Sequence, residues 1–190
     1  GERKGRKGGK NEEIEREAVE NAQIGSADTN YGFKVVSGQL KPGESGSGKI
    51  VINVKLNTES LGKNCDVMLI DSSAGIGCPV IASISGTDFV IAVTEPTPSG
   101  FSDLKRALDM VKIFKVPQGI IINKCDLNSK FTKEIEKFAE KKNIPIMAKF
   151  GYDRDFVNAL VNMSPIIVYK PPYRSQFDGI VNKLKKIKIL

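Results

Sequence analysis

Residues 65–78 read Cys-Asp-Val-Met-Leu-Ile-Asp-Ser-Ser-Ala-Gly-Ile-Gly-Cys, a short apolar run that ends at an aspartate and passes directly into a glycine-containing turn. The apolar residues 67–70 cannot alternate between core and solvent, so they predict a short, fully buried parallel strand. Asp71 would then stand at the carboxyl end of that strand, the edge at which open α/β sheets bind ligands. A carboxylate there can hold a magnesium-bound water, while Gly75 and Gly77 let the backbone approach a phosphate. The alternative is a strand end whose aspartate only caps the following turn.

The chain on either side of this stretch alternates between strand and helix patterns. Strands separated by helices build βαβ units, so we expect an α/β fold with a doubly wound, mostly parallel sheet. The strands are expected near residues 66–71, 88–94, 118–123 and 144–149, and the helices near 99–115, 129–142, 153–163 and 173–188.

The helix expected over residues 99–115 has the clearest start and core face. Ser99 can cap it, and Asp103 places a negative charge in its first turns, where the helix dipole favours one. Leu104, Leu108 and Val111 then follow one face with helical spacing, which is typical of core packing.

The amino-terminal part is more polar. We expect residues 1–11 to be disordered, residues 12–21 to form a short charged helix, and residues 32–37 to form a strand. Residues 50–61 fit a helix or a strand equally well. The domain organisation that follows is a basic, charged segment over residues 1–28 and an α/β domain over residues 29–190.

Composition limits the classes of function. The 190 residues carry a net charge of +7, but the basic residues gather at the two ends without interleaved aromatic rings, so no nucleic-acid partner is expected. No apolar run has the length of a bilayer span and no signal peptide is visible, which favours the cytoplasm. Cys65, Cys78 and Cys125 have neither a disulfide pattern nor [4Fe–4S] spacing, and Cys78 is expected to pack in a turn.

Several motifs, in order, are shared with one family. From about residue 29 to residue 170 the chain resembles the MinD/ParA branch of P-loop ATPases, specifically the MinD-like ATPases that carry an inserted ferredoxin domain. The motifs are Tyr-Gly at 31–32, Leu-Lys-Pro-Gly-Glu at 40–44, Ser-Gly-Lys at 47–49, Leu-Ile-Asp at 69–71, Gly-Ile-Gly-Cys-Pro-Val-Ile at 75–81, Val-Thr-Glu-Pro-Thr at 93–97, Ser-Gly-Phe-Ser-Asp-Leu-Lys-Arg at 99–106 and Ile-Asn-Lys-Cys-Asp-Leu at 122–127.

The resemblance implies ATP and magnesium as ligands. It assigns Asp71 to magnesium or the attacking water, Gly75 and Gly77 to the turn that senses the γ-phosphate, and Asn123 to the base. It also implies a homodimer, or a complementing chain, and an iron–sulfur or redox partner whose [4Fe–4S] cluster this chain does not bind. A family member would have Gly-Pro or Pro-Pro where this chain has Ser-Ser at 72–73.

The chain corresponds to the carboxyl-terminal portion of the family, without its phosphate loop or ferredoxin domain. Residues 43–49 fit G-x-x-x-x-G-K, but Ile50 replaces the hydroxyl residue that binds magnesium, and no buried strand leads into the loop. Residues 7–10 resemble the start of another phosphate loop but run into two glutamates. We therefore expect an incomplete sheet and no ATP hydrolysis by this chain alone, because the groups that stabilise phosphoryl transfer are missing.

The base-binding loop leaves two nucleotides open. Asn123 can bind adenine through its amide, whereas a carboxylate at Asp126 would suit the paired donors of guanine. The remaining motifs favour ATP, with Asp126 as a loop residue. Glu95, at another strand end, is a candidate supporting residue beside the nucleotide, and residues 151–153 are expected to close over the base.

Two further interpretations stay open. The chain can be a non-enzymatic nucleotide-binding scaffold, which Ser72 and Ser73 favour. It can also bind a membrane surface, because Ile180, Val181, Leu184 and Ile187 form one face of a terminal helix and lysines crowd the others. A helix that packs on the sheet explains the same pattern.

Overall fold

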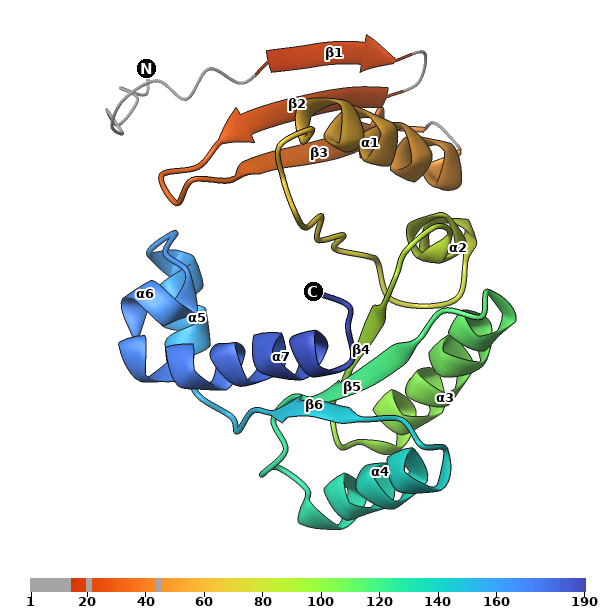
Figure 1. The fold of residues 1–190 in the computed structure, drawn as a ribbon, viewed down its shortest axis with the longest axis vertical. Helices are drawn as coiled ribbons and strands as arrows, with labels where there is room; N and C mark the ends of the chain where they lie inside the picture. The colour runs from red at the N-terminus through yellow and green to blue at the C-terminus, as the bar shows by residue number, and fades with distance from the viewer. Residues whose placement is uncertain (1–14, 20–21, 44–45) are drawn as a thin grey trace. The chain divides into compact units, whose positions relative to one another are not determined.

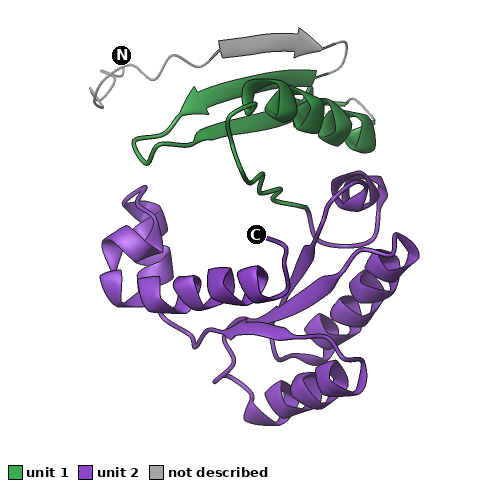
Figure 2. Ribbon diagram, viewed as in Figure 1, with its two compact units in different colours: residues 1–72 green, residues 73–190 purple. Residues whose placement is uncertain are grey.

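The computed structural model describes residues 15–19, 22–43 and 46–190, and the chain divides into two compact units, residues 1–72 and 73–190 (Figures 1 and 2). The domain boundary expected between residues 28 and 29 falls inside the first unit, at the turn between two strands. The disorder expected for residues 1–11 lies outside the described residues.

The first unit contains an antiparallel sheet with strand order β1-β2-β3, made of β1 (Glu15–Val19), β2 (Ala22–Asp28) and β3 (Lys34–Leu40). The helix expected over residues 12–21 is therefore wrong for its described part, because residues 15–19 pair with β2 from Glu15↔Ser26 to Val19↔Ala22. Charged residues with good helix propensity form a strand here because tertiary pairing overrides a weak local preference. The strand expected over residues 32–37 exists as β3, but its partner is the antiparallel β2.

Helix α1 (Ser47–Leu61) packs on β3, and it resolves the ambiguity of residues 50–61 in favour of a helix. Gly38 in β3 makes the contact possible. A Cβ atom on Gly38 would lie 2.6 Å from the Val54 side chain and 2.9 Å from that of Ile50, which is too close without a shift. The missing side chain thus allows the helix to approach the strand.

The second unit is an α/β unit with a parallel sheet of order β4-β5-β6, as the alternating pattern predicts. The parallel α/β character is confirmed, and each strand lies close to the predicted position. The elements are α2 (Cys78–Ile84), β4 (Val90–Thr94), α3 (Pro98–Ile113), β5 (Gln118–Ile122), α4 (Ser129–Lys141), β6 (Ile146–Lys149), α5 (Asp155–Val161), α6 (Ile166–Tyr169), the 3₁₀ turn η1 (Pro171–Tyr173) and α7 (Arg174–Lys186).

Successive residues of β5 face opposite sides of this sheet. Ile120 and Ile122 are fully buried in a cluster with residues of α3 and α4, including the predicted core residues Leu104 and Leu108. Ile121 belongs to a second cluster with Met147 of β6 and residues of α7. Because a strand buried on both faces needs apolar residues at every position, this packing explains the continuous apolar run of β5.

The strand predicted over residues 66–71 is wrong. Residues 67–70 pair with no strand within the described ranges, and the Leu69 side chain is 92% exposed. An apolar run indicates a tendency to be buried, but a strand also needs a neighbour for its backbone groups. In the second unit the sheet ends at β4, where the Val93 side chain is 64% exposed.

Helix α7 closes the second unit. Ile180 is buried, and Leu184 packs against the cluster around Met147 and Phe150. The sheet-packing interpretation thus accounts for half of the predicted apolar face, while Val181 and Ile187 stay about 40% exposed. In the part of the chain that the structure describes, no helix has the length and apolar character needed to cross a membrane.

Candidate functional site

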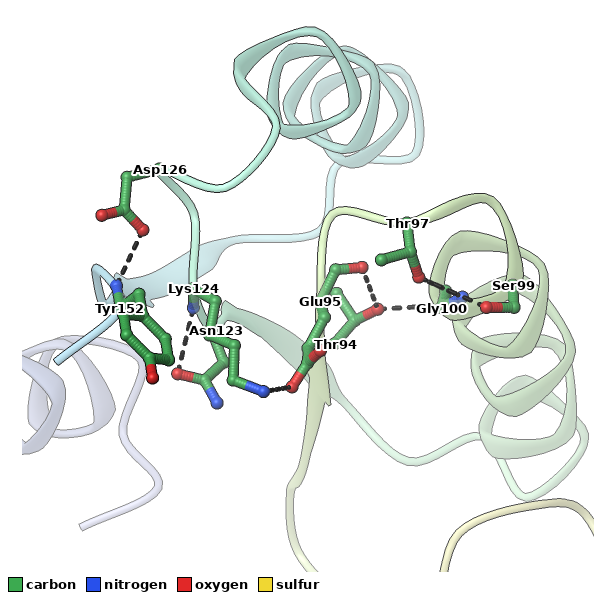
Figure 3. Close-up of polar contacts among 9 residues, drawn as sticks. All are labelled: Thr94, Glu95, Thr97, Ser99, Gly100, Asn123, Lys124, Asp126 and Tyr152. Carbon is green, nitrogen blue, oxygen red and sulfur yellow. Dashed lines mark hydrogen bonds and ion pairs between the residues drawn. The ribbon is translucent and has the colours of Figure 1, made fainter. Parts of the chain in front are cut away.

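The loops that follow β4, β5 and β6 share the carboxyl edge of the parallel sheet, and polar side chains gather there (Figure 3). Glu95 follows β4, Asn123 to Asp126 follow β5, and Tyr152 follows β6. This edge is where open α/β sheets bind their ligands. It therefore defines the candidate site.

The loop after β4 is held by the start of α3. The buried Thr94 hydroxyl donates to the Gly100 carbonyl at 3.0 Å, and the Gly100 amide donates to the Thr97 hydroxyl at 3.0 Å. Thr97 is therefore the cap, and the expected cap Ser99 is wrong, since Pro98 already occupies the first turn of the helix. A proline at that position puts the cap on the preceding residue.

An ion pair joins the loops after β4 and β5. Lys124 Nζ lies 2.6 Å from Glu95 Oε1, and the Asn123 amide donates to the Thr94 carbonyl at 2.8 Å. Lys124 has a φ of 51°, in the left-handed region, which turns the chain sharply after β5. Glu95 thus contacts the loop that follows β5.

Asn123 is half-buried at the end of β5. Its side-chain Oδ1 accepts a hydrogen bond from the backbone amide of Lys124 at 3.0 Å. This contact orients the side-chain amide at the sheet edge, where an amide can both donate to and accept from a ligand.

Asp126 has a structural partner. Its Oδ1 accepts a hydrogen bond from the backbone amide of Tyr152 at 2.7 Å, so the carboxylate ties the loop after β5 to the turn after β6. This contact fits the loop role that the sequence favours for Asp126.

The neighbouring Asp153 is the centre of a cluster that the sequence did not indicate. Its Oδ2 accepts from Lys170 Nζ at 2.6 Å and from the Tyr173 hydroxyl at 2.7 Å, and Lys170 also lies 2.8 Å from Asp155 Oδ2. The hydrogen bond from Lys170, with those from the Asp155 amide and Tyr173, lowers the pKa of Asp153 to about 2. The same carboxylates raise the pKa of Lys170. No local pattern pairs residues that lie 17 and 20 positions apart.

The residues expected to bind phosphate and magnesium lie on other segments of the chain than these loops. Asp71 belongs to the first unit and is exposed. Gly75 has a φ of 104°, which an L-residue rarely adopts, and Gly77 directly precedes α2. A magnesium–nucleotide complex uses one or two carboxylates besides phosphate and water oxygens, so Asp71 is chemically suited to it.

The three cysteines are free thiols on different segments of the chain. Cys78 is exposed at the start of α2, so its expected packing is wrong; Cys65 is exposed and Cys125 half-buried. Within the described ranges, no group of three or more His, Cys, Asp or Glu side chains is arranged to hold a metal ion. Residues 41–43, the described start of the glycine-rich stretch, follow β3, whose residues are mostly exposed, so a buried strand does not lead into this stretch. The second phosphate-loop resemblance, at residues 7–10, lies outside the described residues.

Comparison with known proteins gives relatives without a described activity. The chain matches no protein-family model. It is 34% identical to the uncharacterized protein MJ0578 of Methanocaldococcus jannaschii over 98 residues, which are 52% of this chain and 35% of that protein. It is 36% identical to the uncharacterized protein MJ0579 of the same organism over 97 residues, 51% of this chain and 35% of that protein. The match thus spans about a third of the length of each relative.

Proposed function

We propose that this chain is part of a cytoplasmic nucleotide-binding protein of the MinD/ParA type of P-loop ATPases, and that it binds ATP with magnesium. The observation that carries the proposal is the gathering of Glu95, Asn123, Lys124 and Asp126 at the carboxyl edge of a parallel sheet. Open α/β sheets usually bind their ligands through polar side chains at that edge.

We assign a different part of the nucleotide to each segment. The Asn123 amide binds the base, and the Glu95–Lys124 ion pair supports the loop that carries it. Gly75 and Gly77 form the turn near the γ-phosphate, and Asp71 positions the magnesium-bound water. Bound magnesium would neutralise phosphate charge.

The base preference in the proposal is adenine. A carboxylate that reads guanine accepts hydrogen bonds from two ring donors at once. Asp126 Oδ1 already accepts from the Tyr152 amide at 2.7 Å, which supports a loop role and leaves Asn123 to contact the base.

Two further parts of the proposal concern what lies outside this chain. The phosphate loop comes from a complementing chain or from a homodimer partner, and without it the chain binds nucleotide but does not turn it over. Nucleotide state is coupled to an iron–sulfur or redox partner that holds a [4Fe–4S] cluster. The resemblance supports this coupling.

Calorimetric titration with ATP and magnesium tests the proposal. Asn123→Ala should weaken ATP binding by about two- to tenfold, because a hydrogen bond contributes about 0.5–1.5 kcal/mol net. Asn162→Ala is the matched control, since Asn162 lies beyond the end of α5. No ATP binding by the unaltered protein, or equal losses in both variants, would contradict the proposal. ATP turnover that disappears in Asp71→Ala would contradict the lack of hydrolysis.

A second candidate is a nucleotide-binding scaffold without turnover. The exposure of Asp71, together with the unpaired residues 67–70 in the described ranges, favours it, because a catalytic carboxylate needs a fixed position. Nucleotide binding without turnover, in protein supplied with the complementing chain, would distinguish this scaffold from the ATPase.

A further inference from the structure

The turn over residues 150–153 is held to the neighbouring strand end by its backbone. The Phe150 amide donates to the Ile122 carbonyl at 2.9 Å, and the Cys125 amide donates to the Phe150 carbonyl at 2.9 Å. These bonds continue the parallel ladder between β5 and β6 past its last paired residues. The start of the turn therefore has little freedom to move.

Two carboxylates fix the rest of the turn. Asp126 accepts from the Tyr152 amide at 2.7 Å, and Asp153 accepts from Lys170 at 2.6 Å and from Tyr173 at 2.7 Å. Hydrogen bonds to an ionised carboxylate are shorter and stronger than neutral ones. The backbone of Tyr152 thus lies between two charged anchors.

The side chain of Tyr152 is nonetheless 56% exposed. The ring is thus held in solvent on a fixed backbone, since the Tyr152 amide itself donates to Asp126. Phe150 and Asp153, on either side of it in the turn, are also tied to other elements. An aromatic ring on a preorganised turn loses little freedom when it stacks on a flat ligand, so it makes a good stacking platform. Figure 3 shows Tyr152 on the same sheet edge as Asn123.

We infer that Asp126 is a positioning residue, which acts through the Tyr152 amide to set the Tyr152 ring for stacking on the base of a bound nucleotide. The inference rests on the proposed function. It goes further because it assigns Asp126 a positioning role. The carboxylate oxygen accepts the hydrogen bond of the Tyr152 amide, and Asp126 does not itself recognise the base.

The conservative variant separates these roles. Asp126→Asn keeps an oxygen at the same place as an acceptor for the Tyr152 amide, whereas Asp126→Ala removes it. Likewise, Tyr152→Phe keeps a ring that can stack, and Tyr152→Ala does not. Asp109→Ala serves as the control, because Asp109 is exposed on α3.

The experiment uses the full chain and two measurements. Amide hydrogen exchange by NMR follows the Tyr152 amide without ligand, and calorimetry gives the affinities for ATP and for inorganic tripolyphosphate. We expect Asp126→Ala to speed exchange at Tyr152 and to weaken ATP binding roughly tenfold, with a smaller effect in Asp126→Asn, whose neutral oxygen still accepts the amide but forms a weaker hydrogen bond. Tyr152→Ala should weaken ATP binding by roughly tenfold and Tyr152→Phe should not, as removal of a stacking ring predicts. Tripolyphosphate binding should not change in any variant, because it has no base.

Each other outcome overturns the inference in a distinct way. Unchanged exchange in Asp126→Ala, with ATP still bound by the unaltered protein, would refute the anchoring and leave the proposed function intact. Faster exchange with unchanged ATP affinity would reduce Asp126 to a structural residue. Equal losses for ATP and tripolyphosphate would point to general disruption of the site. If the unaltered protein binds no ATP, the proposed function fails and this inference fails with it.

Discussion

Replacement of Thr97 by alanine should destabilise α3, and replacement of Ser99 should not. The Thr97 hydroxyl accepts the hydrogen bond of the Gly100 amide at 3.0 Å, one of the amides that a helix start leaves without a helical partner. Loss of such a cap costs about 1 kcal/mol, within a range of roughly 0.5–2 kcal/mol. Thr97 is exposed, so water can reach the freed amide, and the middle of that range is expected.

Ser99 offers a matched comparison on the same turn. Its hydroxyl lies 3.3 Å from that of Thr97 and accepts no described backbone amide. Alanine has a better helix propensity than serine by about 0.5 kcal/mol, so Ser99→Ala should leave the stability unchanged or raise it slightly. Thr97→Ser should retain most of the stability, because it keeps the accepting oxygen.

Native-state hydrogen exchange is the suitable assay. The chain has two compact units, so a single denaturation curve does not report on α3 alone. The free energy of opening at the α3 amides should fall by about 1 kcal/mol in Thr97→Ala, while amides of the first unit serve as an internal reference. An equal or larger loss in Ser99→Ala would refute the assignment of the cap to Thr97.

Three further predictions address the charges and the sheet edge. The pKa of Asp153 is lowered to about 2 from an ordinary 3.8, so its ionised form stabilises the fold above about pH 4, and this contribution disappears as the pH falls toward 2. In urea denaturation between about pH 2 and 5, the stability of Asp153→Asn should therefore depend less on pH than that of the unaltered protein. The Glu95–Lys124 ion pair is only partly buried, so Glu95→Gln should lower the free energy of unfolding by at most about 1 kcal/mol. Salt at about 1 M should reduce the difference between the denaturation midpoints of the variant and the unaltered protein. A difference that salt does not change would contradict an ion-pair origin. Val93→Lys should reduce aggregation measured by light scattering, because a lysine on the edge strand β4 opposes pairing with another chain. Val157→Lys on α5 adds the same charge away from the edge and should have less effect; equal effects would mean that net charge alone is responsible.

Local patterns predicted most of the second unit. The alternation of apolar runs and helical spacing placed β4, α3, β5, α4 and β6 close to their observed positions. The apolar spacing of α3 also identified Leu104, Leu108 and Val111 as buried residues. These signals are reliable because each depends on neighbours within a few residues.

The candidate site was predicted only in part. Strand ends marked Glu95, Asn123 and Asp126 as edge residues, but their partners came from the tertiary structure. Lys124 reaches Glu95 from another loop, and Tyr152 meets Asp126 from a third. No pattern in the sequence pairs such residues, because strand order and loop conformation bring them together.

The sequence by itself determined the parallel α/β character of residues 73–190, since the period of apolar residues decides whether a segment becomes a strand or a helix. The tertiary structure alone decided which strands pair. Residues 15–19 became a strand through contacts with β2, and residues 67–70, despite their apolar run, have no strand partner within the described ranges. The physical reason is that a helix satisfies its backbone hydrogen bonds within its own segment, whereas a strand depends on a neighbour that can lie anywhere in the chain.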